Sequence, residues 1–194
     1  MKGFGYALEK RWGDMTDEQR SLMLTGIVHD ADRMDQILRL LVDAARVSSG
    51  SLEPYPDRAD LGDVVGSIAD MERRDPEHPP IEWIGDAGPY FLDPIRVKTA
   101  LLAFDESLLW WAGEGPVVFD ARRDGNAVEI VASRLGSTID TPEADALFLP
   151  RSPGTGGGSK IGLFVVRGVA EAQGGSAWGS VEDGRLLLHL RLPV

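Results

Sequence analysis

The chain has 194 residues, 43% hydrophobic and 26% charged, which is the composition of a soluble globular protein with one large domain or two small ones. Its 20 Lys and Arg against 31 Asp and Glu give a net charge of −11, which argues against a general binder of nucleic acids or anionic membranes. The lack of Cys excludes disulfides, thiolate catalysis and Cys-based metal sites, and three widely separated histidines argue against a His-rich metal site.

The first fifty residues have a helical pattern. A short amphipathic helix is predicted over residues 3–12, and Thr16 with Gln19 forms a capping box that starts a second helix running to about residue 48. Apolar residues on the second helix follow a heptad-like rhythm, and these seam residues are Met23, Ile27, Met34, Leu38, Leu41 and Ala45. A hairpin this small cannot bury its seam alone, so we expect it to pair with a second copy in a four-helix bundle.

A Gly- and Pro-punctuated boundary at 48–56 separates this hairpin from a region of alternating helices and strands. Helices are predicted at about 61–73, 94–112 and 160–173, and strands at 81–84, 89–92, 117–121, 127–132, 177–182 and 186–192. Residues 133–159 are predicted to be irregular, and the Gly-rich loop 137–158 to be mobile without ligand. The fold class is therefore α+β, with one mixed sheet covered by helices on one face.

The order of these elements resembles a sensor histidine kinase core of bacterial two-component signal transduction. Leu41–Gly50 is similar to the end of that family's dimerisation hairpin, Asp93–Val97 to the start of its asparagine-box helix, and Gly158–Gly175 to its last glycine box and the following helix. The resemblance implies a dimerisation hairpin over 1–50, with its first helix truncated, and an ATPase-type (GHKL, HATPase) α/β sandwich over 51–194. It also implies a homodimer that works with a response regulator or a partner kinase in a phosphorelay.

The family's phosphoacceptor histidine would lie upstream of Lys2. His29 is the only histidine of the hairpin, but Arg33 comes one place late and Met34 stands where the family has Pro. We therefore interpret His29 as a solvated surface residue and expect no catalytic residue in this chain.

The asparagine-box helix resembles the family's in position but not in chemistry. Ala103 and Ser107 stand at the two Asn positions, Trp110 at the basic position and Trp111 at the aromatic one. Ala cannot bind a cation, and a lone Ser hydroxyl is a poor Mg²⁺ ligand. We expect one of Trp110 and Trp111 to lie in the core and the other to cover it, rather than either ring to stack on adenine.

The glycine boxes are altered in the same way. The resemblance places Arg134 at the adenine-reading Asp position, where a guanidinium cannot accept a hydrogen bond, and Thr138 replaces a Gly. Lys160 replaces the middle Gly of the last box, although a Gly-rich loop entering a helix can still bind an anion. The predicted vestigial nucleotide pocket is Ser107, Trp111, Arg134, Gly136, Thr138, Gly158, Ser159, Lys160, Gly162 and Leu163.

These departures predict a degenerate, pseudokinase-like signalling or scaffolding module with no metal site and no cofactor. The alternative is a fragment of a working histidine kinase whose phosphoacceptor segment lies upstream, in which case ATP and Mg²⁺ would bind. A third hypothesis is a sandwich that binds another anion through 156–160. No segment reaches the ~18 apolar residues of a membrane helix, and there is no signal peptide. We therefore expect a cytoplasmic segment without membrane contact, whose parent chain could be membrane-anchored.

Overall fold

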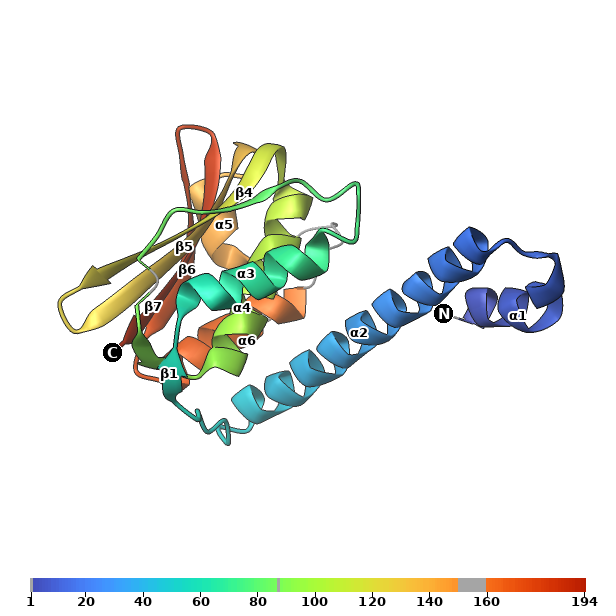
Figure 1. The fold of residues 1–194 in the computed structure, drawn as a ribbon. Coiled ribbons are helices and arrows are strands. Elements are labelled where there is room, and N and C mark those ends of the chain that lie inside the picture. Colours follow the sequence, from blue (N-terminus) through green and yellow to red (C-terminus); the bar gives the residue numbers. More distant parts are fainter. Residues whose placement is uncertain (1, 87, 150–159) are drawn as a thin grey trace. The chain divides into compact units, whose positions relative to one another are not determined.

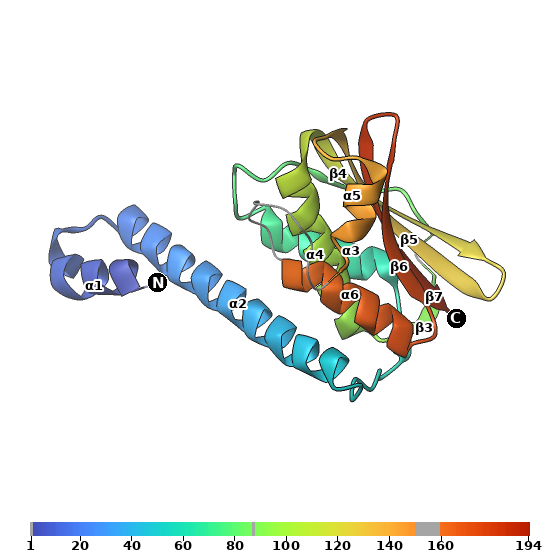
Figure 2. The ribbon, with the colours of Figure 1, turned by 180° about the vertical axis from the view of Figure 1, so that it is seen from behind.

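The computed structural model describes residues 2–86, 88–149 and 160–194, which form two compact units, Met1–Val42 and Asp43–Val194. Figures 1 and 2 show the chain from two opposite sides. No helix among the described residues is long and apolar enough to span a bilayer.

The first unit contains the predicted helical hairpin. Helix α1 (Lys2–Arg11) is followed by a 3₁₀ turn (Trp12–Asp14) and by α2 (Asp17–Ser48), whose last six residues belong to the second unit. The capping box is confirmed, because the Thr16 hydroxyl accepts from the Gln19 N–H at 3.2 Å and the Gln19 amide oxygen accepts from the Thr16 N–H at 3.0 Å. The Arg20 side chain donates twice to the Trp12 carbonyl, at 3.1 and 2.8 Å, and so holds the turn between the helices.

Helix α1 folds back on α2 where α2 lacks a side chain. A Cβ built on Gly26 would lie 2.9 Å from the Phe4 ring, so glycine permits this close approach. Beyond this contact α2 presents large apolar side chains to solvent, and those on the predicted seam include Met34, Leu38 and Leu41, which are about half exposed.

The second unit is an α/β sandwich. Its helices are α3 (Leu61–Glu72), α4 (Pro94–Trp111), α5 (Thr141–Ala146) and α6 (Lys160–Ala172). Its strands are β1 (Asp57–Ala59), β2 (Ile81–Trp83), β3 (Tyr90–Leu92), β4 (Ala112–Asp124), β5 (Ala127–Ser137), β6 (Ser176–Glu182) and β7 (Arg185–Pro193). The main sheet has the order β2-β4-β5-β7-β6, with β2 parallel to β4 and the other pairs antiparallel. Strands β1 and β3 form a separate two-stranded sheet.

The helices cover one face of the main sheet, as predicted (Figures 1 and 2). Strand residues alternate accordingly: Val117, Phe119 and Ala121 are buried in the core, whereas Val118 and Asp120 face away from it. Phe104 of α4 and Phe148 meet edge to face in this core, with ring centroids 6.2 Å apart.

The predicted N-cap of α4 is confirmed and belongs to a buried charged network. Asp93 accepts hydrogen bonds from the backbone N–H groups of Ile95 and Arg96 through one carboxylate oxygen, and from that of Tyr55 through the other. The Arg96 guanidinium pairs with Asp43, near the end of α2, and both side chains are more than nine-tenths buried. This network fastens the C-terminal part of α2 and the segment after it to the start of α4.

Two expectations about residues 133–159 were wrong. Strand β5 continues to Ser137, because β4 starts at Ala112 and pairs with it across the bulge between Glu114 and Val118. Helix α5 was missed, although Asp140 and Glu143 form a capping box and Pro142 stands in its first turn. The predicted mobility of 137–158 falls partly on residues 150–158, which lie outside the described residues.

Gly168 on α6 provides a test of the packing in the second unit. A Cβ at this position would overlap the methyl carbons of Val47 on α2, so Gly168→Val should lower the free energy of unfolding by about 1–3 kcal/mol through overpacking. Chemical denaturation would measure this. Gly66→Val is the matched control, because a Cβ at Gly66 of α3 meets nothing within 4 Å. The added change Val47→Ala should recover part of the loss, because it removes both methyl groups but leaves the Cβ of residue 47 in place, and no recovery would contradict the assigned contact.

Candidate functional site

The asparagine-box positions lie buried on α4. Ala103 and Ser107 are 7% and 5% exposed, and the Ser107 hydroxyl donates a 2.7 Å hydrogen bond to the Ala103 carbonyl one turn earlier. Ser107, the polar residue of the two, therefore uses its hydroxyl proton for a hydrogen bond within α4. This contact between the two positions serves the helix itself.

Trp110 and Trp111 end α4 with different environments. Trp111 is partly buried against the hydrophobic core, whereas Trp110 is 52% exposed. This arrangement fits the expected division into one core aromatic and one cover. The Trp111 carbonyl accepts from both the N–H and the hydroxyl of Thr138, at 2.8 and 3.0 Å, so the end of α4 and the segment after β5 are joined.

Arg134 is tied to the irregular start of β4. Its guanidinium donates to the Ala112 carbonyl at 2.7 Å and to the Gly115 carbonyl at 3.2 Å. Gly115 lies within the β4–β5 register shift and Ala112 pairs with Ser137 just before it, so Arg134 satisfies acceptors in and beside the bulge. The Arg134 guanidinium thus supports the backbone at this point of the sheet.

Gly136 has a conformational reason to be glycine. Its φ of +79° lies in the left-handed region, and a Cβ there would be 3.0 Å from the Glu114 side chain. Its N–H donates to the Gly184 carbonyl at 3.0 Å, so the hairpin between β6 and β7 holds this end of β5.

The last glycine box is described only in part. Gly158 and Ser159 lie outside the described residues, and of Lys160 only the backbone is described, as the first residue of α6. Gly162 and Leu163 follow in the first turns of α6 and are buried. The predicted anion loop is therefore not tested.

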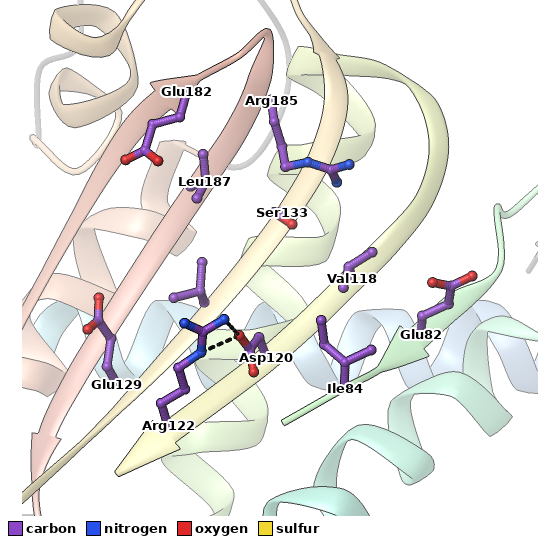
Figure 3. A pocket seen from close by; sticks show the side chains of 11 residues that line it. Glu82, Ile84, Val118, Asp120, Arg122, Glu129, Ser133, Glu182, Arg185 and Leu187 are labelled. Atoms are coloured by element: carbon purple, nitrogen blue, oxygen red, sulfur yellow. Dashed lines mark hydrogen bonds and ion pairs between the residues drawn. The ribbon is translucent and has the colours of Figure 1, made fainter. Parts of the chain in front are cut away.

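A hollow of about 560 Å³ lies on the open face of the main sheet, away from the helices (Figure 3). Its charged lining consists of four carboxylates and two guanidiniums, namely Glu82, Asp120, Glu129, Glu182, Arg122 and Arg185. None of the predicted pocket residues whose side chains the structure describes lines it. A net negative lining repels a polyphosphate, so this hollow does not replace the nucleotide pocket.

A hydroxyl, an imidazole and a carboxylate meet on this same open face. The Ser180 hydroxyl lies 2.9 Å from His189 Nε2, and His189 Nδ1 lies 3.0 Å from Glu129. The order is that of a nucleophile, a base and an orienting acid. However, the N–H after Ser180, which could stabilise an oxyanion, donates to the Thr141 hydroxyl at 2.9 Å. We therefore interpret the network as a link across β5, β7 and β6, the strands that carry its three members.

A second polar cluster was missed by the sequence analysis because its members come from separate elements. His78, in the loop after α3, places Nε2 at 2.9 Å from Asp105 Oδ2 of α4 and at 4.0 Å from Glu72 Oε2 of α3. The His78 and Asp105 side chains are 4% and 5% exposed. The hydrogen bond to Asp105 raises the pKa of His78, and the Pro79 carbonyl and the charge of Glu72 act in the same direction. The one feature of the sequence that points to this cluster is Asp105, an acidic residue after a mostly apolar stretch of α4.

This raised pKa predicts how the stability contributed by His78 depends on pH. Because the folded-state pKa lies above the unfolded value, the contribution is complete below the unfolded pKa and is lost as pH rises through the folded one. The difference in unfolding free energy between the unmodified chain and His78→Gln should therefore shrink between pH 5.5 and pH 9, as followed by urea denaturation with a chelator in every buffer. When both proteins also carry Asp105→Asn, the difference between them should no longer change with pH. A pH dependence of unchanged size would contradict the pairing of His78 with Asp105.

Comparison with solved structures identifies the fold. The chain is similar to the histidine kinase AdeS of Acinetobacter baumannii, with 16% identity and a TM-score of 0.68 over 99% of this chain and 92% of that one. It is also similar to full-length ShkA, solved in complex with AMPPNP, with 20% identity and a TM-score of 0.66 over 93% of this chain and 40% of that one. A mycobacterial sensor histidine kinase, MprB, matches with 21% identity and a TM-score of 0.59 over 72% of this chain and 97% of that one.

No protein-family model and no curated protein sequence matches the chain. The structural matches nevertheless confirm the expected fold, a helical hairpin followed by a sandwich of the histidine-kinase ATPase type.

Proposed function

We propose that this protein is a histidine-kinase-like signalling module without kinase activity of its own, which acts by dimerising, by relaying a conformational signal and by docking a response regulator or a partner kinase. The observation that carries the proposal is the use of the pocket side chains. Ser107, Arg134 and Thr138 each donate to a backbone carbonyl of the protein itself, at 2.7 to 3.2 Å.

The residues at these positions are unsuited to adenine recognition and to Mg²⁺ binding, two tasks of a nucleotide pocket. Arg134 offers donors where the adenine amino group needs an acceptor, and those donors already have acceptors at Ala112 and Gly115. Ala103 and Ser107 provide no carboxylate or amide oxygen for Mg²⁺. The hairpin over 1–50 would then supply the interaction surface, and the sandwich over 51–194 would respond to it or to a partner.

The exposed apolar residues of α2 support a homodimer as the working form. Met34, Leu38 and Leu41 are about half exposed in one chain, and covering such a stripe removes apolar area from water. We expect light scattering to give the mass of two chains. Leu38→Glu with Leu41→Glu should give the mass of one chain, whereas Leu22→Glu, at an off-seam residue of α2 that is 74% exposed, should leave the dimer intact. A monomer mass for the unmodified chain at every concentration would contradict the dimer.

The alternative proposal is a working kinase whose phosphoacceptor segment lies upstream of Lys2. Its support is the fold shared with histidine kinases. Radiolabelled ATP incubated with the longest form of the parent chain separates the two proposals. Label on a histidine upstream of Lys2, transferred by the same chain, would establish the alternative, and an absence of label together with dimer formation supports the non-catalytic module.

A further inference from the structure

The geometry points to a binding site for a divalent transition-metal ion formed by Glu72, His78 and Asp105 in the second unit. One donor atom from each residue lies within 4.8 Å of the other two. The three residues belong to the end of α3, the loop after it and the middle of α4. The sequence predicted no metal site, because it lacks Cys, its histidines are far apart in the chain, and Ala103 and Ser107 are poor ligands.

The two nitrogens of the His78 ring both face hydrogen-bond acceptors. Nδ1 lies 2.6 Å from the Pro79 carbonyl, and Nε2 lies 2.9 Å from the Asp105 carboxylate. A neutral imidazole carries one N–H, so with Nδ1 donating to the carbonyl its Nε2 lone pair points at an anion. Such an arrangement needs a cation at Nε2, which is either a proton or a metal ion. A backbone carbonyl that holds the other N–H is the usual support of a metal-bound histidine.

Asp105 gives a second and independent indication. Its Oδ1 atom is the one buried side-chain polar atom of the described residues that has no hydrogen-bond partner, and the side chain is 5% exposed. Leaving a buried carboxylate oxygen unsatisfied is costly in free energy. A metal ion held by both oxygens of Asp105 would satisfy Oδ1 together with Oδ2, which already faces the ring.

The distances suit a small N/O-binding ion after a modest adjustment. Zinc bonds of ~2.0–2.2 Å to imidazole and carboxylate in a tetrahedron place neighbouring donors about 3.3–3.5 Å apart. The Nε2–Asp105 distance of 2.9 Å would widen and the Nε2–Glu72 distance of 4.0 Å would shorten, each by about half an ångström. One imidazole with two carboxylates suits zinc or a similar first-row ion better than Ca²⁺ or Mg²⁺, which prefer oxygen ligands alone.

The site would connect α3, the loop after it and α4, on the side of α4 opposite to the asparagine-box positions. Asp105 lies two residues from both Ala103 and Ser107, so its side chain leaves α4 on the opposite side from theirs. A bound ion would join α3 and the loop after it to the helix that carries the asparagine-box positions.

Isothermal titration of the 194-residue chain, freed of any affinity tag, with Zn²⁺ tests the site. We expect one ion per chain and at least a tenfold weaker affinity in both His78→Gln and Asp105→Asn. His189→Gln, which removes a mostly buried histidine outside the cluster, should bind as the unmodified chain does. No binding by the unmodified chain, or equal affinity in His78→Gln, would overturn the assignment.

If either variant fails to fold by circular dichroism, the unmodified chain still decides the question. X-ray absorption of its zinc form should show one imidazole with oxygen ligands, and Co²⁺ should give the intense visible bands of a four-coordinate site. More than one imidazole, or water oxygens alone, would contradict the proposed ligand set.

Discussion

Replacing Arg96 by Met should lower the free energy of unfolding of the second unit by about 3–5 kcal/mol, because it breaks a buried ion pair and leaves its partner charge in place. Arg96 pairs with Asp43 and lies 3.9 Å from the Asp93 carboxylate, and the three side chains are all more than nine-tenths buried. Without the guanidinium, two carboxylates stay in a region that water hardly reaches. Urea denaturation followed by Trp fluorescence would measure the change.

Arg39→Met is the matched control for this experiment. Arg39 pairs with Asp35 at 2.8 Å one turn apart on α2, but both side chains are more than 60% exposed. An exposed pair of this kind contributes only about 0.3–0.5 kcal/mol. A loss from Arg96→Met no larger than that from Arg39→Met would show that the network does not hold the end of α2 to α4.

Arg134→Asp introduces the residue that the resemblance implies for adenine reading, and it should destabilise the protein and still not restore ATP binding. It removes donors from the Ala112 and Gly115 carbonyls and places an anion beside them, which should cost about 1.5–3 kcal/mol of unfolding free energy. Arg123→Asp is the matched control, because Arg123 donates to the Gly125 carbonyl at 3.3 Å from an exposed position. Thermal unfolding would rank the two variants.

Recovery of binding should need several changes together. Ser107→Asn would supply a Mg²⁺ ligand and Lys160→Gly the family's loop glycine, and with Arg134→Asp these form the smallest set that we expect to help. Each lost contact of ~1.4 kcal/mol weakens affinity tenfold, so one restored contact leaves the others missing. Micromolar ATP binding by Arg134→Asp alone would contradict this interpretation.

The elements with strong local signals were predictable from the sequence. The capping box of Thr16 and Gln19 and the N-cap of Asp93 start helices where predicted. The start of β4 and the end of β5 were not predictable from the sequence. They depend on a bulge between the two strands and on Arg134, whose hydrogen bonds link residues far apart in the chain. Helix α5 was predictable in principle from its own capping box, but the Gly-rich segment after it favoured an irregular interpretation.

The candidate site was predictable only as a set of departures from a family pattern. The resemblance to a family pattern suggested pocket positions for Ser107 and Arg134, but it gave no sign of the backbone carbonyls that accept their hydrogen bonds. The cluster of His78 and Asp105 could not be found from spacing, because its members are 27 positions apart in the chain, with strands β2 and β3 between them. Contacts of that kind arise from tertiary packing, which local patterns do not encode.

Isothermal titration of the 194-residue chain with ATP and Mg²⁺ is the most direct test of a kinase fold without a working nucleotide pocket. Two or three lost contacts move a micromolar site to millimolar affinity or weaker, so we expect a Kd of about a millimolar or higher. A Kd in the low micromolar range for the unmodified chain would contradict the account and favour a working kinase.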